Sequence, residues 1–232
     1  MKGYLTLLLL MVIIVGTVSA QHQQPWCGVT TLFFQHNAST SPAGYEELIN
    51  YPSGNPEVDE SITITNANGW VLVDSYITPE GALDETIEDL AGLRRYKFFS
   101  YVSSNVGTTQ FNFTPSKRAA DGTETVFYSA ISEDINSLTP DEYLLSHVSQ
   151  TSLMLNPGDR IVIKVYVKTT HSSPITVHWL YQGSTNTSHV ESGYFVCEEF
   201  QEQNSLVPAG LLFAFIGGLI GTIVLSRRGL GK

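Results

Sequence analysis

The side chains best suited to acid–base chemistry in this sequence are its carboxylates. All 22 acidic residues lie between Glu46 and Glu202. Two carboxylates that face each other across a groove can hydrolyse a glycosidic bond, yet no spacing in the sequence singles out such a pair. We therefore expect most of these acids to form a solvated surface, and we keep a carboxylate-based glycan hydrolase as an alternative function.

Other catalytic and metal-binding motifs do not occur. The six histidines form no HExxH pair, and there is no G-x-S-x-G elbow or phosphate-binding glycine loop. Asp59, Glu60 and Asp159 could offer oxygen ligands to calcium, but they lack EF-hand spacing, so we predict no metal or other cofactor. We expect a non-enzymatic protein with His178 on its surface.

The two cysteines lie near the ends of the segment between the apolar termini. Cys27 and Cys197 allow one intramolecular disulfide, which an exported chain would form. Closing a loop of about 170 residues would stabilise the fold by about 5 kcal/mol in the chain-entropy model. The alternatives are two separate thiols or an intermolecular bridge.

Aromatic residues crowd the middle of the chain and place rings on both faces of the predicted strands. A buried face needs only half of these rings. Phe99 and Tyr101 belong to the other half. They could form an exposed platform for a sugar or a protein partner, or they could be covered by a second sheet or a long loop.

The elements that must position these residues are predicted to be β-strands. In residues 160–168, Ile161, Ile163, Val165 and Val167 form one row, which indicates a strand with one buried side. An "NPGD" turn precedes it at 156–159, and the strand at 174–182 is predicted to be its antiparallel neighbour. Further strands are predicted at 61–66, 70–78, 94–103, 108–118, 125–132 and 143–155.

These segments predict an all-β fold, an antiparallel β-sandwich of about eight strands. Residues 36–60 look irregular, and residues 79–93 are predicted to form a loop or one helical turn outside the core. Asp121 and Gly122 are predicted to form a turn between two strands.

The blocks "KRAADGTET", "LNPGDRIVIKVYVKTT" and "LYQGSTNTSHV" resemble a jelly-roll β-sandwich module of viral and phage structural proteins and of prokaryotic surface proteins. The resemblance covers about residues 45–195. It implies a role in display, adhesion or shell building, and it implies no catalytic residues.

The ends of the chain indicate export and a membrane anchor. Residues 1–20 have the pattern of a signal peptide, residues 21–197 form the predicted extracytoplasmic domain, and residues 198–205 form a short linker. Residues 206–225 carry no charge and are long enough to cross a bilayer. The basic tail at 226–232 stays cytoplasmic by the positive-inside rule. We expect a single-pass type I protein at the cell surface.

The C-terminal tail also resembles a PEP-CTERM-type sorting signal, with "VPAG" at 207–210 in place of the usual Val-Pro-Glu-Pro. The resemblance implies a cut near Pro208, whereas a plain stop-transfer helix would be retained. Gly217 and Gly221 form a GxxxG that could pair two helices in a homodimer.

The net charge and the N-glycosylation sequons indicate which partners and modifications to expect. The segment between the predicted signal and the span contains 22 acidic and eight basic residues, and this negative net charge disfavours nucleic-acid binding. Sequons at Asn37, Asn112 and Asn186 predict a glycoprotein. The main interpretation is a membrane-anchored surface protein for display, adhesion or recognition of a glycan or protein. The alternatives are the glycan-active hydrolase and a virion surface protein.

Overall fold

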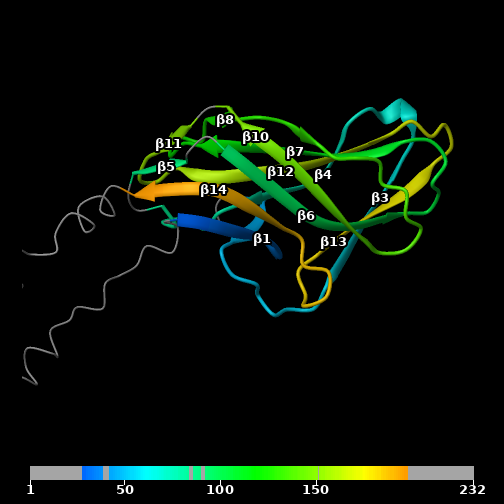
Figure 1. Ribbon diagram of the computed structural model, residues 1–232, viewed down its shortest axis with the longest axis horizontal. Helices are drawn as coiled ribbons and strands as arrows, with labels where there is room; N and C mark the ends of the chain where they lie inside the picture. Colours follow the sequence, from blue (N-terminus) through cyan, green and yellow to red (C-terminus); the bar gives the residue numbers. More distant parts are fainter. Residues whose placement is uncertain (1–27, 39–41, 84–85, 90–91, 151, 198–232) are drawn as a thin grey trace, which may run out of the picture.

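The computed structural model describes residues 28–38, 42–83, 86–89, 92–150 and 152–197. These residues form an all-β structure with one short 3-10 turn (Figure 1). The strands in this part of the chain are β1 (Gly28–Ala38), β2 (Glu46–Ile49), β3 (Val58–Ile64), β4 (Val71–Ile77), β5 (Ile87–Asp89), β6 (Gly92–Val102), β7 (Thr109–Arg118), β8 (Glu124–Val126), β9 (Ala130–Ile131), β10 (Asp141–Ser149), β11 (Leu153–Leu155), β12 (Arg160–Thr169), β13 (Ile175–Tyr181) and β14 (His189–Cys197).

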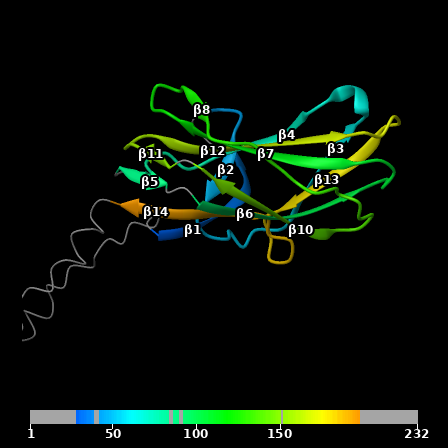
Figure 2. The same ribbon diagram turned by 45° about the horizontal axis from the view of Figure 1, so that its top comes forward.

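One continuous hydrogen-bonded path connects ten of the strands and folds over into two layers, while β5, β9, β10 and β11 pair beside it. The path runs β3-β13-β6-β14-β1 and continues β2-β4-β12-β7-β8. β2 is the corner, because it pairs antiparallel with β1 and parallel with β4. In Figure 2, β12 and β7 lie above β14 and β6. The result is a β-sandwich, as the alternating sequence pattern predicted.

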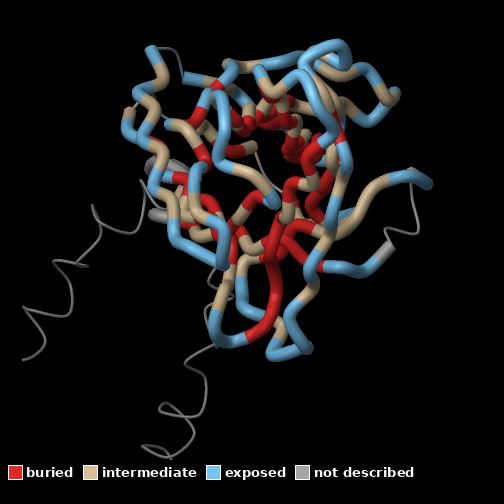
Figure 3. The backbone as a smooth tube through the Cα atoms, turned by 90° about the vertical axis from the view of Figure 1, so that its right-hand side faces the viewer, coloured by how far each residue is buried: buried red, intermediate tan, exposed pale blue. Residues whose placement is uncertain are grey.

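Aromatic side chains from both layers meet in the core. The ring of Trp179 on β13 lies 5.5 Å from that of Phe111 and 5.8 Å from that of Phe113, both on β7. Tyr96 on β6 stacks on Phe113 at 4.6 Å. In Figure 3 the buried parts of the backbone gather toward the middle of the molecule and the exposed parts lie mostly at its periphery. Burial of these rings is the main stabilising contribution that holds the layers together.

The predicted inward row of β12 is confirmed. Ile161, Ile163, Val165 and Val167 are all buried in the core. Val162 is buried as well, because β12 lies in the middle of its layer between β4 and β7. The "NPGD" turn is also present: the Asp159 amide donates to the Asn156 carbonyl, and Gly158 has a φ of 86°.

The predicted pairing of residues 160–168 with 174–182 is wrong. β12 pairs with β4 and β7, whereas β13 pairs with β3 and β6. The short link between β12 and β13 therefore passes from one layer to the other instead of closing a hairpin. Trp179 consequently packs across the core from β12 and does not extend the same sheet.

The number of strands and several boundaries also differ from the prediction. The described residues contain fourteen strands, where about eight were expected. Residues 125–132 divide into β8 and β9, residues 143–155 divide into β10 and β11, and β1, β2 and β14 were not predicted. In the segment predicted to lie outside the core, Leu83 and Ile87 are core residues, and residues 87–89 form β5.

β13 and β14 lie along the same edge of β6, with a loop between them. Leu180 is opposite Phe99 and His189 is opposite Lys97, so residues 182–188 interrupt what would otherwise be one strand. The side chain of Ser188 links this loop to β6 and β13. Its Oγ accepts a hydrogen bond from the Phe99 amide at 3.1 Å and donates one to the Leu180 carbonyl at 2.5 Å. This loop thereby projects from the outer face of the sandwich at a fixed position.

The predicted signal peptide, linker, membrane span, basic tail, sorting signal at Pro208 and Gly217/Gly221 pair lie outside the described residues. Within the described part, no helix is both long and apolar enough to cross a membrane. Cys27 also lies outside, while Cys197 ends β14, two residues beyond the residue that pairs with Gly28. The disulfide stays a prediction.

Candidate functional site

Three carboxylates from three strands come together at one edge of the interior. Glu46 is on β2, Glu60 on β3 and Asp74 on β4, and we call them the carboxylate cluster. Glu60 is opposite Trp179, and Asp74 is opposite Val165. Paired positions share a face of the sheet, so both acids occupy inward positions that otherwise hold apolar side chains.

The hydroxyl of Tyr181 connects two members of the cluster. It lies 3.0 Å from Glu46 Oε2 and 3.3 Å from Glu60 Oε2. A phenol has one proton to donate, so it can donate a hydrogen bond to only one of these carboxylates at a time. The other carboxyl group must carry a proton in order to hydrogen-bond to the phenol oxygen. His36 Nδ1 lies 2.8 Å from Glu46 Oε1 and 3.2 Å from the Tyr181 hydroxyl.

Tyr76 links the cluster to the core. The Trp179 indole donates to the Tyr76 hydroxyl at 3.0 Å, and Tyr76 in turn hydrogen-bonds the Asp74 carboxylate. The Asp74 carboxylate also accepts the Ser75 amide at 2.6 Å. Asp74 is therefore linked through Tyr76 to Trp179, one of the largest fully buried side chains.

Burial makes the cluster retain protons. It raises the pKa of Glu60 to about 7, and repulsion from Asp74 and Glu46 adds to that shift. Burial also raises the pKa of Asp74, against the hydrogen bonds it accepts, and raises the pKa of Glu46, with repulsion from Asp74 as the second cause. Near neutral pH Glu60 is therefore only partly ionised, so it can both release and accept a proton.

The cluster is reachable from solvent on the side of His36. The His36 side chain is 60% exposed and that of Glu46 is 19% exposed. A protonated acid beside an ionised carboxylate at such a border is suited to general acid–base catalysis. Perturbed acids of this kind mark functional sites more often than ordinary surface acids do.

The acids considered as calcium ligands do not converge. Asp59 pairs with His178 at 2.8 Å, Asp159 pairs with Lys117 at 3.2 Å, and Glu60 belongs to the cluster. Among the described residues, no group of three or more His, Cys, Asp or Glu side chains could hold a metal ion. His178 lies on the outer face, as expected from its position in the strand.

Phe99 and Tyr101 both belong to the outer face of β6 but enter different surroundings. Phe99 is 9% exposed and lines a pocket together with Phe33 and His189. Tyr101 stacks on His178 with ring centroids 3.9 Å apart and donates to Asp59. The two rings therefore do not form one continuous exposed platform.

The sequons lie in three settings. Asn186 is on the loop between β13 and β14, and Asn112 is on β7, where it accepts from Ser129 Oγ at 2.7 Å. Asn37 is exposed near the end of β1, and its sequon continues into residues outside the described part. Glycosylation stays a prediction at each of them.

Comparison with known proteins finds a shared fold. No family model and no curated protein matches this sequence. An aminopeptidase from a marine sediment archaeon, Thaumarchaeota archaeon, matches 73% of this chain with a TM-score of 0.55 and 12% identity. An α-amino acid ester hydrolase matches 72% with a TM-score of 0.54 and 12% identity. The chain spans 37% and 36% of their lengths.

These matches correct one expectation. The chain was expected to be non-enzymatic, and this expectation is contradicted to the extent that the same fold occurs as part of two hydrolases. The carboxylate cluster, within the described residues, contains three acids with raised pKa values.

Proposed function

We propose that this protein is a hydrolase that works by carboxylate acid–base chemistry at the carboxylate cluster. The observation that carries the proposal is the Tyr181 hydroxyl placed between Glu46 and Glu60, two acids whose pKa values are both raised. The fold shared with two hydrolases supports it.

The two acids take different roles because their surroundings differ. Glu60 is the proton donor to the leaving group, since a carboxyl with a pKa of about 7 is partly protonated at neutral pH. Glu46 is the carboxylate that activates water or attacks the substrate, since His36 lies 2.8 Å from it and acts to lower its pKa against the effect of burial. Tyr181 positions both.

Glycosidic bonds are the substrate class that fits this pair best. Their hydrolysis uses one protonated carboxyl and one carboxylate, with no metal and no serine nucleophile. In this proposal Glu60 and Glu46 supply this combination. We further propose that the domain acts outside the cell, held by residues 206–225. The eight-residue linker reaches at most roughly 26 Å, so substrate would be met close to the membrane.

The test is turnover by the purified full-length protein. We would assay nitrophenyl glycosides alongside aminoacyl nitroanilides and amino acid esters, the latter two being the substrate types named by the similar structures. Glycoside turnover is expected, and Glu60→Gln should reduce kcat by at least about 100-fold. The loss should be largest for substrates with poor leaving groups, which need the proton most.

Glu133→Gln is the matched control, because Glu133 is an exposed acid outside the cluster. It should leave kcat unchanged. Turnover of the aminoacyl substrates alone would replace the glycosidic assignment, while glycoside turnover that persists in both Glu60→Gln and Glu46→Gln would remove the cluster as the active site.

A further inference from the structure

A pocket of about 490 Å³ opens on the outer face of the layer that contains β1, β14 and β6. This volume falls within the range of small-molecule sites, about 300–1,000 Å³. It lies on the face opposite the core, whereas the carboxylate cluster occupies inward positions. Nothing in the proposed hydrolysis uses it.

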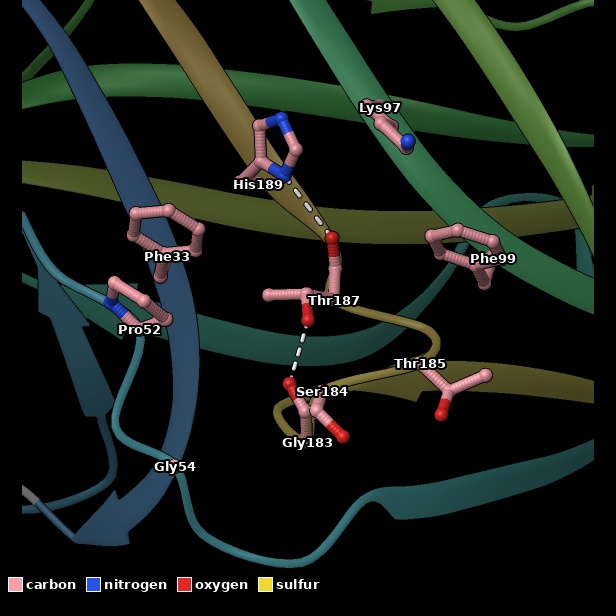
Figure 4. Close-up of a pocket in the computed structure, with 10 residues that line it drawn as sticks. All are labelled: Phe33, Pro52, Gly54, Lys97, Phe99, Gly183, Ser184, Thr185, Thr187 and His189. Atoms are coloured by element: carbon pink, nitrogen blue, oxygen red, sulfur yellow. Dashed lines mark hydrogen bonds between the residues drawn. The ribbon is translucent and has the colours of Figure 1, made fainter.

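The floor of the pocket is a row of side chains across three neighbouring strands. Phe33 on β1 is paired with His189 on β14, and His189 is paired with Lys97 on β6. Phe99 follows two residues after Lys97 on the same face. Figure 4 shows the rings of Phe33 and Phe99 on either side of His189. Two aromatic rings thus flank a central polar region.

The rim of the pocket is a row of hydroxyl groups on the loop that interrupts the β13–β14 edge. Ser184, Thr185 and Thr187 line it. His189 Nδ1 lies 3.0 Å from the Thr187 carbonyl. A carbonyl only accepts, so Nδ1 carries the proton and a neutral ring keeps Nε2 as an acceptor.

Several contacts fix the rim before any ligand binds. Gln182 accepts from the His36 amide and donates to Ser53 Oγ. Gly183 has a φ of 73°, and a Cβ there would lie 3.0 Å from the backbone of Glu57, so a side chain at this position would be strained. Thr187 Oγ1 donates to the Gly183 carbonyl at 2.5 Å. A pre-formed rim lowers the entropy cost of binding.

We propose that this outer-face pocket binds a pyranose ring of a carbohydrate. A pyranose has one apolar C–H face, which carries slight positive charge and is attracted to the negative face of an aromatic ring. Its edges carry hydroxyl groups, which suit the hydroxyls of the rim and the ammonium of Lys97. A purely apolar ligand would leave the polar rim without partners at a cost in affinity.

Lys97 adds a cation without making the pocket strongly basic. Its Nζ lies 2.8 Å from Glu142 Oε2 and 5.5 Å from the centroid of the Phe99 ring. The pairing with Glu142 offsets most of its charge, so neutral sugars are favoured over highly anionic ones. Sugar binding at this pocket is separate from hydrolysis, because it needs no member of the carboxylate cluster.

The test is binding of the full-length protein to an array of neutral and acidic oligosaccharides, followed by titration with the strongest binder. The protein is made in a host without N-glycosylation, so no sugar on Asn186 competes. Phe33→Leu and Phe99→Leu keep apolar bulk but remove the rings, and each should weaken binding at least tenfold. Thr185→Val changes an exposed rim hydroxyl and should weaken it severalfold without affecting folding.

Tyr101→Leu is the matched control, because Tyr101 lies on the same face of β6 but outside the pocket. It should leave affinity within twofold of the unmodified protein. Absence of any bound sugar, or binding unchanged by Phe33→Leu, Phe99→Leu and Thr185→Val, would overturn the proposal. Glu60→Gln should bind normally, so a failure of the hydrolase proposal is distinguished from a failure of this one.

Discussion

Glu60 Oε2 lies 3.3 Å from the hydroxyl of Tyr181, on the inward face that the paired strands β3 and β13 share. A carboxyl at this position replaces an apolar residue in a core row. Its burial is compensated by a phenol and not by a cation, which is why its pKa rises instead of falling. The arrangement to which catalysis is assigned in our proposal therefore opposes folding when the acid is ionised.

Stability should fall as pH rises through neutrality. The pKa of Glu60 is about 7 in the folded protein, against an ordinary value of 4.5 that applies to the unfolded chain. Between these two values the folded state binds more protons than the unfolded state does. The full shift corresponds to about 3 kcal/mol, and partial solvation reduces it to about 1–2 kcal/mol. Urea unfolding between pH 5 and 8 measures this loss.

Glu60→Gln should remove most of this dependence of the unfolding free energy on pH and stabilise the protein at pH 8 by about 1 kcal/mol. Some slope should remain, because burial also raises the pKa of Asp89 to about 6. Glu133→Gln should retain the full slope. A wild-type protein equally stable at pH 5 and pH 8 would contradict the buried-acid description of the cluster.

Tyr76→Phe should destabilise the fold by about 1–3 kcal/mol. The substitution leaves the buried indole N–H of Trp179 without its acceptor, and an unpaired buried donor costs this much. Equilibrium urea unfolding followed by tryptophan fluorescence measures the difference. Tyr166→Phe is the control, since it removes a hydroxyl from the outward side of β12, and its effect should stay within about 0.5 kcal/mol.

Ser188→Ala should destabilise the protein by about 2 kcal/mol, because it leaves the buried Phe99 amide without its acceptor. The same change also removes the sequon at Asn186. Asn186→Gln removes that sequon while keeping Ser188, so it separates the two effects. Equal destabilisation by both variants, measured as the shift in unfolding free energy, would show that Ser188 does not hold the interrupted strand.

Cys27 and Cys197 should be joined in the exported protein. Gly28 pairs with Phe195, so Cys197 ends its strand beside the start of β1. Peptide mapping by mass spectrometry without reduction should recover one cross-linked peptide that contains both cysteines. Two separately alkylated cysteines in the non-reduced protein would contradict the disulfide.

The parts of the fold that depend on local alternation were predictable, and the parts that depend on layer assignment were not. The alternating pattern that includes Ile163 and Val165 predicted an inward-facing row directly from the sequence. The link between β12 and β13 is short enough for a hairpin, and the sequence alone does not distinguish a hairpin from a connection between layers. β1 was missed although Thr30, Leu32 and Phe34 alternate as buried residues.

The carboxylate cluster could be predicted only in part. Glu60 occupies an inward position in the row that includes Ile62 and Ile64, and a charged residue in an apolar row is a recognisable signal. Asp74 was harder to place, because the register of β4 shifts between Val165 and Tyr166 of β12 and changes which positions face inward. The site also contains Glu46, Tyr181 and His36, which lie on other strands. No spacing in the sequence predicts that these residues come into contact.

Gln35→Leu should stabilise the protein. Gln35 is buried on β1, and neither its amide nitrogen nor its amide oxygen has a hydrogen-bond partner in the described part of the chain. Burying an unsatisfied amide is costly, and leucine has nearly the same length without polar atoms. We expect a gain of about 1 kcal/mol, read as a rise of about 2–4 °C in Tm. Gln110→Leu is the control: the Gln110 amide donates to the Ser132 carbonyl at 3.0 Å, so the same change there should destabilise. A loss of stability in Gln35→Leu would mean that this amide is satisfied by water or by residues outside the described part.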